Sequence, residues 1–170
     1  MKKFNIGIYI LLISIITFGL SSCKKDNITL ENNLPEIPVT VANQYALFTA
    51  PTVSTSLSGG GNVVVELEIP ASSGRTIKEI TKVAVGTAYS AIQATTGLYR
   101  STPIAGNGTK VTFTTTLAEY ATFTKLTLPT AAQAGTTSAV AILARNFYFL
   151  ITLDNGQTIV PQYVRVYVDK

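Results

Sequence analysis

Two segments of the chain alternate between apolar and polar residues with a period of two. In residues 62–69, one face of an extended chain carries Val63, Val65, Leu67 and Ile69. In residues 110–117, the corresponding face carries Val111, Phe113, Thr115 and Leu117. Such alternation is typical of a strand with one buried face and one solvated face. The two segments therefore predict half-buried β-strands.

The rest of residues 37–170 has a similar texture, with β-branched and aromatic residues between Gly, Pro and Asn. We expect strands near residues 38–48, 62–69, 76–85, 98–104, 110–117, 123–128, 144–153 and 158–168. Short strands at this spacing predict an all-β domain, an antiparallel sandwich of two sheets. Residues 86–97 show no strand pattern. The Ala-rich residues 129–143 are interrupted at Gly135, and we expect a loop there.

The last two predicted strands form a hairpin around Asn155-Gly156. This dipeptide favours a two-residue type I′ turn, because both central positions of that turn need a positive φ. A two-residue turn places Leu153 opposite Thr158, Ile151 opposite Val160, Phe147 opposite Val164 and Tyr148 opposite Tyr163. Pro161 has no N–H to donate, so the last strand is an edge or bulges there.

The order of the last three strands resembles that of immunoglobulin-like and fibronectin type III-like domains, in which a long terminal hairpin closes the sandwich. The resemblance covers residues 37–170. The chain has one Cys and no Trp, so the Cys and Trp hallmarks of antibody-type domains are absent. The resemblance therefore implies only the broad fold.

The N-terminal segment has the pattern of a targeting signal. Lys2 and Lys3 precede an uncharged apolar run of 15 residues, Ile6–Leu20. A helix that spans a bilayer needs about 20 apolar residues, so this run fits the apolar region of a signal peptide better. Ser21, Ser22 and the only cysteine, Cys23, follow the run.

Leu20-Ser21-Ser22-Cys23 resembles the lipobox of bacterial lipoproteins. The resemblance implies that residues 1–22 are a signal peptide and that acyl chains are attached to Cys23. Two acyl chains are enough for stable membrane anchoring. An ordinary secretory signal followed by a free thiol, or an uncleaved anchor, would be the alternatives.

The residues after the cysteine are polar and show no periodicity. Lys24-Lys25-Asp26 is similar to the start of mature lipoproteins in Bacteroidota-type bacteria, which implies the outer membrane. Surface-exported members carry several acids here, whereas this chain has Asp26 followed by Asn27, so the side of the membrane is left open. We expect residues 23–36 to be the lipidated Cys and a short tether, followed by one domain, 37–170.

The composition excludes several kinds of chemistry. The chain has no His and one Cys, so it has no imidazole base, no Ser–His or Cys–His pair and no thiolate zinc site. We expect no cofactor and no metal site. Its 13 basic residues are scattered, and two of them lie in the predicted signal peptide. Nucleic-acid binding needs a clustered basic face, so we expect no nucleic-acid partner.

Four other motifs contain residue types found in catalytic, phosphate-binding or calcium-binding sites. Glu66 and Glu68 share a strand face at about 7 Å, which a glycosidase pair could use, but nothing marks either carboxylate as buried, and we expect a solvated outer face. Gly59-Gly60-Gly61 and Gly106-Asn107-Gly108-Thr109 lead into strands, and we expect turns, not phosphate loops. Asp154-Asn155-Gly156 has a single carboxylate and predicts no calcium site.

The strongest candidate for binding is the outer face of the terminal hairpin, which carries Tyr148, Tyr163, Arg165 and Tyr167. Tyrosines beside an arginine can stack on sugar rings or anchor a protein partner. The alternative is that they are ordinary cross-strand pairs. Tyr99-Arg100 is a second, weaker candidate.

These features together predict a membrane-tethered, non-enzymatic binding or accessory module of the cell envelope, with a glycan or a protein as ligand. A structural subunit that pairs through its edge strands is an alternative. An enzyme that uses Tyr, Lys, Ser or Glu is a further one, and it would need a deep pocket with convergent polar groups.

Overall fold

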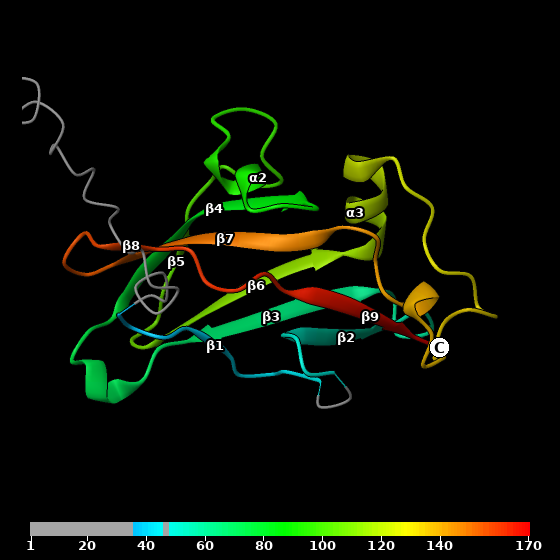
Figure 1. The fold of residues 1–170 in the computed structure, drawn as a ribbon, viewed down its shortest axis with the longest axis horizontal. Helices are drawn as coiled ribbons and strands as arrows, with labels where there is room; N and C mark the ends of the chain where they lie inside the picture. The colour runs from blue at the N-terminus through cyan, green and yellow to red at the C-terminus, as the bar shows by residue number, and fades with distance from the viewer. Residues whose placement is uncertain (1–35, 46–47) are drawn as a thin grey trace, which may run out of the picture. The chain divides into compact units, whose positions relative to one another are not determined.

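The computed structural model describes residues 36–45 and 48–170 (Figure 1). The predicted signal peptide, Cys23 and the tether up to residue 35 lie outside the described residues. The described residues belong to one compact unit. In the described part of the chain, no helix has both the length and the apolar character needed to cross a bilayer.

The first sheet confirms the two alternating segments. It has the order β1-β3-β6, with β1 at Thr40–Val41, β3 at Asn62–Glu68 and β6 at Lys110–Thr116. β3 and β6 pair antiparallel without interruption, from Asn62 opposite Thr116 to Glu68 opposite Lys110. The buried side chains are the predicted ones: Val63, Val65, Leu67, Ile69, Val111, Phe113, Thr115 and Leu117. Residues of the outer face, such as Thr112 and Thr114, are exposed.

The second sheet has the order β5-β4-β7-β8 and is also antiparallel. β4 (Ile77–Gly86) and β7 (Asn146–Leu153) confirm two predicted strands. β5 is only Ile104–Ala105, so most of the strand predicted at 98–104 is missing, although Arg100 forms a single bridge with Val83. β8 is Thr158–Ile159.

The third sheet corrects the prediction of two purely antiparallel sheets. β2 (Thr52–Ser56) pairs in parallel with β9 (Arg165–Asp169). The segment predicted as a strand at 38–48 contains only β1, and β2 was not predicted. β9 carries three consecutive buried residues, Val166, Tyr167 and Val168. Such a run is typical of a strand covered on both faces, which is where parallel pairing is commonly found.

The predicted register of the terminal hairpin is wrong by one residue near the turn. Ile151 pairs with Ile159, and Leu153 N donates to Gln157 O, so the loop has three residues, Asp154 to Gly156. Only Gly156 of these has a positive φ, 84°. The predicted pairing returns at Phe147 and Val164. The strand from 158 to 168 is broken into β8 and β9, and its extra residue lies in the stretch around Pro161, where the sequence predicted a bulge.

The strand predicted at 123–128 is wrong, because residues 123 and 124 end the helix α3 (Leu117–Thr124) and residues 125–128 form no strand. Thr116 caps this helix, and its Oγ1 accepts a hydrogen bond from Glu119 N at 3.1 Å. Thr116 and Glu119 have the spacing of a capping box, which is a signal for a helix start. A shorter helix, α2 (Ser90–Gln93), lies in the segment 86–97, for which no strand was predicted. Two 3₁₀ turns, η2 and η3, occupy Ala71–Ser73 and Ala139–Ala141.

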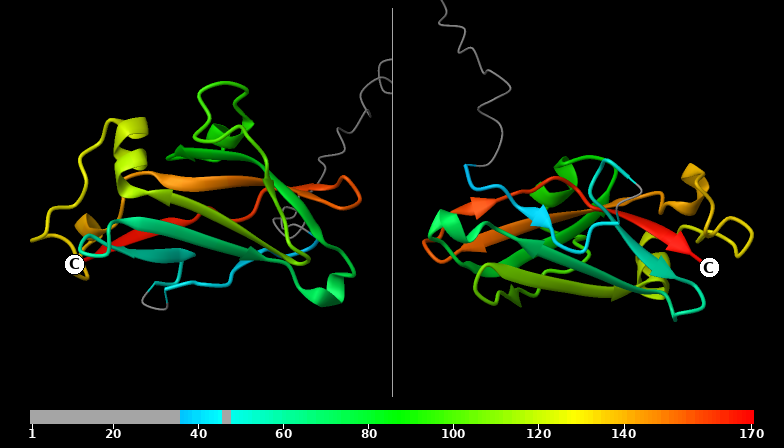
Figure 2. Two further views of the ribbon diagram at one scale, coloured as in Figure 1. Left: turned by 180° about the vertical axis from the view of Figure 1, so that it is seen from behind. Right: turned by 90° about the horizontal axis from the view of Figure 1, so that it is seen from below.

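Side chains from all three sheets contribute to one hydrophobic core, and the fold class is all-β as predicted. Figures 1 and 2 show β4 and β7 in one layer, with β3 and β6 in another. Phe113 of β6 joins the layers, because its ring lies 5.5 Å from the rings of both Phe147 and Phe149 of β7. In Figure 1 the hairpin that carries β8 and the helix α3 lie at opposite ends of these sheets.

Candidate functional site

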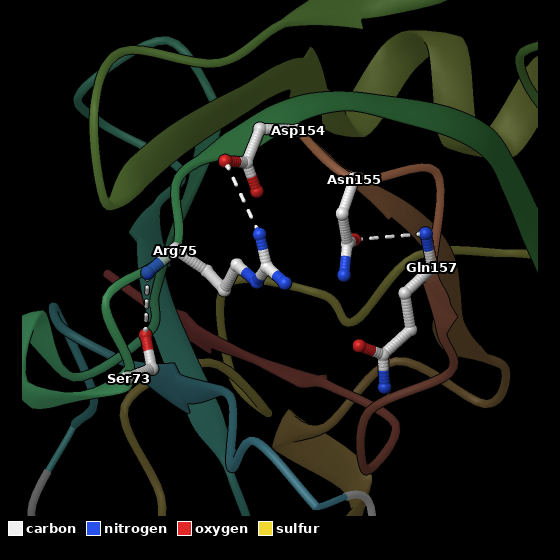
Figure 3. Close-up of polar contacts among 5 residues, drawn as sticks. All are labelled: Ser73, Arg75, Asp154, Asn155 and Gln157. Atoms are coloured by element: carbon white, nitrogen blue, oxygen red, sulfur yellow. Dashed lines mark hydrogen bonds and ion pairs between the residues drawn. The ribbon is translucent and has the colours of Figure 1, made fainter.

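One surface hollow lies beside the first described residues of the domain. This Arg75 hollow measures about 710 Å³ and is lined by Glu36, Ile37, Pro38, Pro70, Ser72, Ser73, Arg75, Asn155 and Gln157. Its residues come from the first described residues, the segment around η2 and the hairpin loop. Figure 3 shows the side chains of Arg75 and Asn155 approaching each other from opposite sides.

Local hydrogen bonds hold the walls of the Arg75 hollow. η2 ends at Gly74, whose φ of 64° turns the chain so that Arg75 N donates to Ser73 Oγ at 3.3 Å. On the other wall, Gln157 N donates to Asn155 Oδ1 at 3.0 Å. Asp154 N donates to Thr76 O at 3.1 Å and thereby joins the two walls.

The charges in the Arg75 hollow are compensated. Arg75 Nη1 lies 3.9 Å from Asp154 Oδ2, and both side chains are 42% exposed. An ion pair with this much solvent contact contributes at most about 1 kcal/mol. Glu36 adds a second carboxylate to the lining. The hollow thus offers amide and hydroxyl groups without excess positive charge, which suits a neutral polar ligand.

A second hollow lies at the other end of the sheets, between the α2 segment and α3. This Arg145 hollow measures about 460 Å³ and is lined by Val85, Gly86, Thr87, Ala88, Ser90, Ala91, Phe123, Thr124 and Arg145. Phe123 projects from α3 and is 40% exposed. Its ring lies 5.0 Å from that of Tyr99 in an edge-to-face contact. The hollow therefore combines a guanidinium, an accessible aromatic ring and hydroxyl groups.

The backbone of Arg145 is fixed by Tyr120, a buried residue of α3. Arg145 N donates to Tyr120 Oη at 2.9 Å, and Tyr120 Oη donates to Arg145 O at 3.3 Å. Burial raises the pKa of Tyr120 above its ordinary value, and the hydrogen bond to the Arg145 backbone partly offsets the rise. The phenol therefore stays protonated and can keep donating to that carbonyl.

A third hollow also adjoins the start of β7 and has no lining residue in common with the Arg145 hollow. This Arg165 hollow measures about 370 Å³ and is lined by Ala139, Ile142, Leu143, Ala144, Asn146, Tyr163 and Arg165. Arg165 is the first residue of β9, and its N–H donates to Pro51 O at 2.9 Å. The side chain of Arg165 is thus carried by a strand that is paired along its length with β2.

A cluster of three tyrosines adjoins the Arg165 hollow, which Tyr163 lines. Tyr148 is buried, and its ring lies 5.1 Å from Tyr89 and 5.9 Å from Tyr163. Tyr163 N donates to Tyr89 Oη at 3.4 Å. Tyr89 precedes α2 and is 45% exposed. The exposed ring of this cluster is therefore Tyr89, which was not among the predicted site residues.

The predicted binding face is divided by the structure. Tyr163 and Arg165 are half-buried and line one hollow, but Tyr148 is only 1% exposed and lies beneath Tyr89. Tyr167 is 3% exposed and belongs to another cluster, stacked on Tyr45 at 5.2 Å. The expectation of an open face with all four side chains is wrong, because loops before β2 and around α2 cover the strands.

Tyr99 and Arg100 are engaged inside the domain. Tyr99 Oη hydrogen-bonds Thr115 Oγ1, which donates to Glu119 Oε2 at 2.6 Å. Burial raises the pKa of Tyr99. The guanidinium of Arg100 lies 5.8 Å from the centre of the Phe113 ring, within the range of a cation–π contact. Both residues have structural partners here.

The remaining motifs have structural explanations. Glu68 pairs with Lys110 at 3.5 Å across the β3–β6 ladder, and Glu66 is half-buried on the same face. Gly60 and Gly61 have φ values of 84° and 68°, and Gly108 has 63°, as expected for turns. Among residues 36–45 and 48–170, no three His, Cys, Asp or Glu residues are grouped so that they could hold a metal ion.

Three comparisons with known proteins give no relative. The chain matches no protein-family model, no curated protein and no solved structure.

Proposed function

We propose that the chain is a lipid-anchored protein of the bacterial cell envelope that binds a ligand, a glycan or a protein, without catalysing a reaction. The observation that carries the anchoring is the position of Leu20-Ser21-Ser22-Cys23 directly after an apolar run of 15 residues. The binding role is supported by the Arg75, Arg145 and Arg165 hollows, whose linings contain arginine, hydroxyl and amide groups. Localisation in the outer membrane is part of the proposal.

The anchor is tested with Cys23→Ser, and Ser22→Ala is the matched control. We expect the wild-type chain and the control to incorporate radiolabelled palmitate and to sediment with membranes, whereas Cys23→Ser is unlabelled and is released from them. Cys23 is the only cysteine, so a maleimide reagent added after denaturation reports its state directly. A wild-type protein that reacts fully with maleimide has a free thiol, and lipid anchoring is then refuted.

A second candidate is a structural subunit that pairs through an open strand edge. In the described residues, β6 forms a ladder only with β3, and its other edge has one bridge, Asn107 to Lys110. Hydrogen bonds Ile69 N to Thr109 O and Leu117 N to Gly61 O show that the odd residues of β6 bond to β3. The backbone groups of Thr112 and Thr114 therefore point to the other edge.

A seven-residue edge strand without proline can pair with another chain. Thr114→Pro removes a donor from the open edge and leaves the bonds to β3 intact, whereas Thr115→Pro removes a donor to β3. If β6 pairs with another chain, an oligomer of the wild-type protein in sedimentation equilibrium becomes a monomer in Thr114→Pro. A wild-type monomer at all concentrations contradicts self-pairing through this strand.

A further inference from the structure

The Arg145 and Arg165 hollows flank the same short segment, Ala144–Asn146. Ala144 and Asn146 line the Arg165 hollow, and the residue between them, Arg145, lines the other. On one side the segment adjoins β4, where Asn146 pairs with Gly86, and on the other it leads to the bridge between Phe147 and Val164. The two hollows are therefore neighbours on one end of the domain.

The only charged side chain that lines each of the two hollows is an arginine. Each hollow contains one guanidinium, and neither is lined by Asp or Glu. In the described part of the chain, the ion pairs within 4.0 Å are Arg75–Asp154 and Lys110–Glu68. Neither Arg145 nor Arg165 has a carboxylate partner there. The Arg75 hollow differs, because its guanidinium faces Asp154 and Glu36 shares the lining.

Aromatic and neutral polar groups accompany the two guanidinium groups. Phe123 presents a partly exposed ring in one hollow, Tyr163 lines the other, and the exposed Tyr89 contacts Tyr163. Ser90 and Asn146 add a hydroxyl and an amide. Guanidinium groups bind carboxylates through paired hydrogen bonds, and aromatic rings pack against the apolar faces of sugar rings.

We propose that the neighbouring Arg145 and Arg165 hollows together bind an acidic glycan, a chain of sugar rings that carry carboxylates. One carboxylate binds Arg145, another binds Arg165, and the intervening rings contact Phe123 and Tyr89. This inference rests on the proposed binding function and names its ligand class.

The test uses full-length protein purified in detergent and two forms of one ligand. Polygalacturonate oligomers carry a carboxylate on each ring, and their methyl-esterified form has the same rings without charge. We expect the acidic oligomers to bind in isothermal titration calorimetry and the esterified ones to bind at least tenfold more weakly. Arg145→Gln and Arg165→Gln each lower the affinity at least tenfold, and Phe123→Ala lowers it several-fold. Arg75→Gln, the matched control in the other hollow, leaves it unchanged.

Several outcomes overturn the inference. Equal binding of the acidic and esterified oligomers removes the role of the carboxylates, and a loss in Arg75→Gln moves the site to the other hollow. If polyglutamate or oligothymidylate binds more tightly than the acidic oligomers, the ligand is an acidic peptide or a nucleic acid and not a glycan. Palmitate labelling does not depend on this assay, so a labelled protein that binds no acidic oligomer refutes this inference alone. Circular dichroism of each variant shows whether it is folded.

Discussion

Gly86 lines the Arg145 hollow, and its replacement by a larger residue is predicted to destabilise the domain. It ends β4 opposite Asn146, and a Cβ added to it would lie 2.8 Å from the Cβ of Ala91 in α2. Carbon atoms in contact are normally separated by about 3.5–4.0 Å. The Gly86→Ala variant therefore has to displace α2 from the sheet.

The size of the effect follows from two opposing contributions. An extra methyl group in a packed contact costs about 1–3 kcal/mol. A Gly→Ala change also lowers the conformational entropy of the unfolded chain, which stabilises the folded state by about 0.4–1 kcal/mol. We expect Gly86→Ala to lower the free energy of unfolding by about 1–2 kcal/mol. Ala91→Gly alone costs about 0.5–1 kcal/mol, because glycine is unfavourable in a helix.

The double variant Gly86→Ala/Ala91→Gly separates a steric clash from other causes. It removes the clashing methyl group, so it is expected to be no less stable than Ala91→Gly alone. The chain has no tryptophan, so urea denaturation is followed by tyrosine fluorescence and circular dichroism. If the two single changes add in the double variant, or if Gly86→Ala costs less than about 0.5 kcal/mol, the reasoning is refuted.

Three further changes test other parts of the structure. Thr116→Ala removes the cap of α3 and is expected to cost about 1 kcal/mol, seen as a fall in Tm of about 2–4 °C; an unchanged Tm contradicts the cap. Lys125 has a φ of 59° at the end of α3, so Lys125→Gly is expected to raise the urea midpoint by the equivalent of about 0.5–1 kcal/mol, and a lower midpoint argues against strain there. Burial raises the pKa of Tyr120, so the folded protein holds that proton more tightly than the unfolded chain. Stability is therefore retained below about pH 10 and falls as the pH rises further, with a smaller fall in Tyr120→Phe; equal pH profiles of the two proteins refute this.

The long strands could be predicted because their own residues encode them. In β3 and β6, alternate side chains face the core, so the period of two is visible in the sequence. β2 and β5 are five and two residues long and depend on distant partners for their pairing. Their own residues carry too little pattern to identify them.

Two errors have specific physical causes. The Asn155-Gly156 dipeptide favours a two-residue turn, but the loop includes Asp154 and only Gly156 takes a positive φ. The β-branched and aromatic residues of 123–128 suggest a strand, but a helix begins at Leu117 and runs to Thr124, and Thr116 caps it with the Thr-x-x-Glu spacing of a capping box. This second signal was present in the sequence and was outweighed by residue propensity.

The candidate site could be predicted only in part. Tyr163 and Arg165 were named from their strand and do line a hollow. Tyr89 and Arg145 were missed because the segments just before α2 and β7 have no periodic pattern, and their positions depend on tertiary contacts such as that between Arg145 and Tyr120. Strand periodicity also cannot show that a loop covers Tyr148.

The parallel pair β2–β9 limits when the domain can complete its folding. Thr52 meets Arg165, more than a hundred residues later in the chain, and β2 has no other strand partner in the described residues. Contacts between such distant residues form slowly, because a long loop must close first. While a nascent chain is being synthesised, β2 has no partner until β9 emerges. If the chain is exported as proposed, this delay keeps the domain unfolded for its passage through a secretion channel.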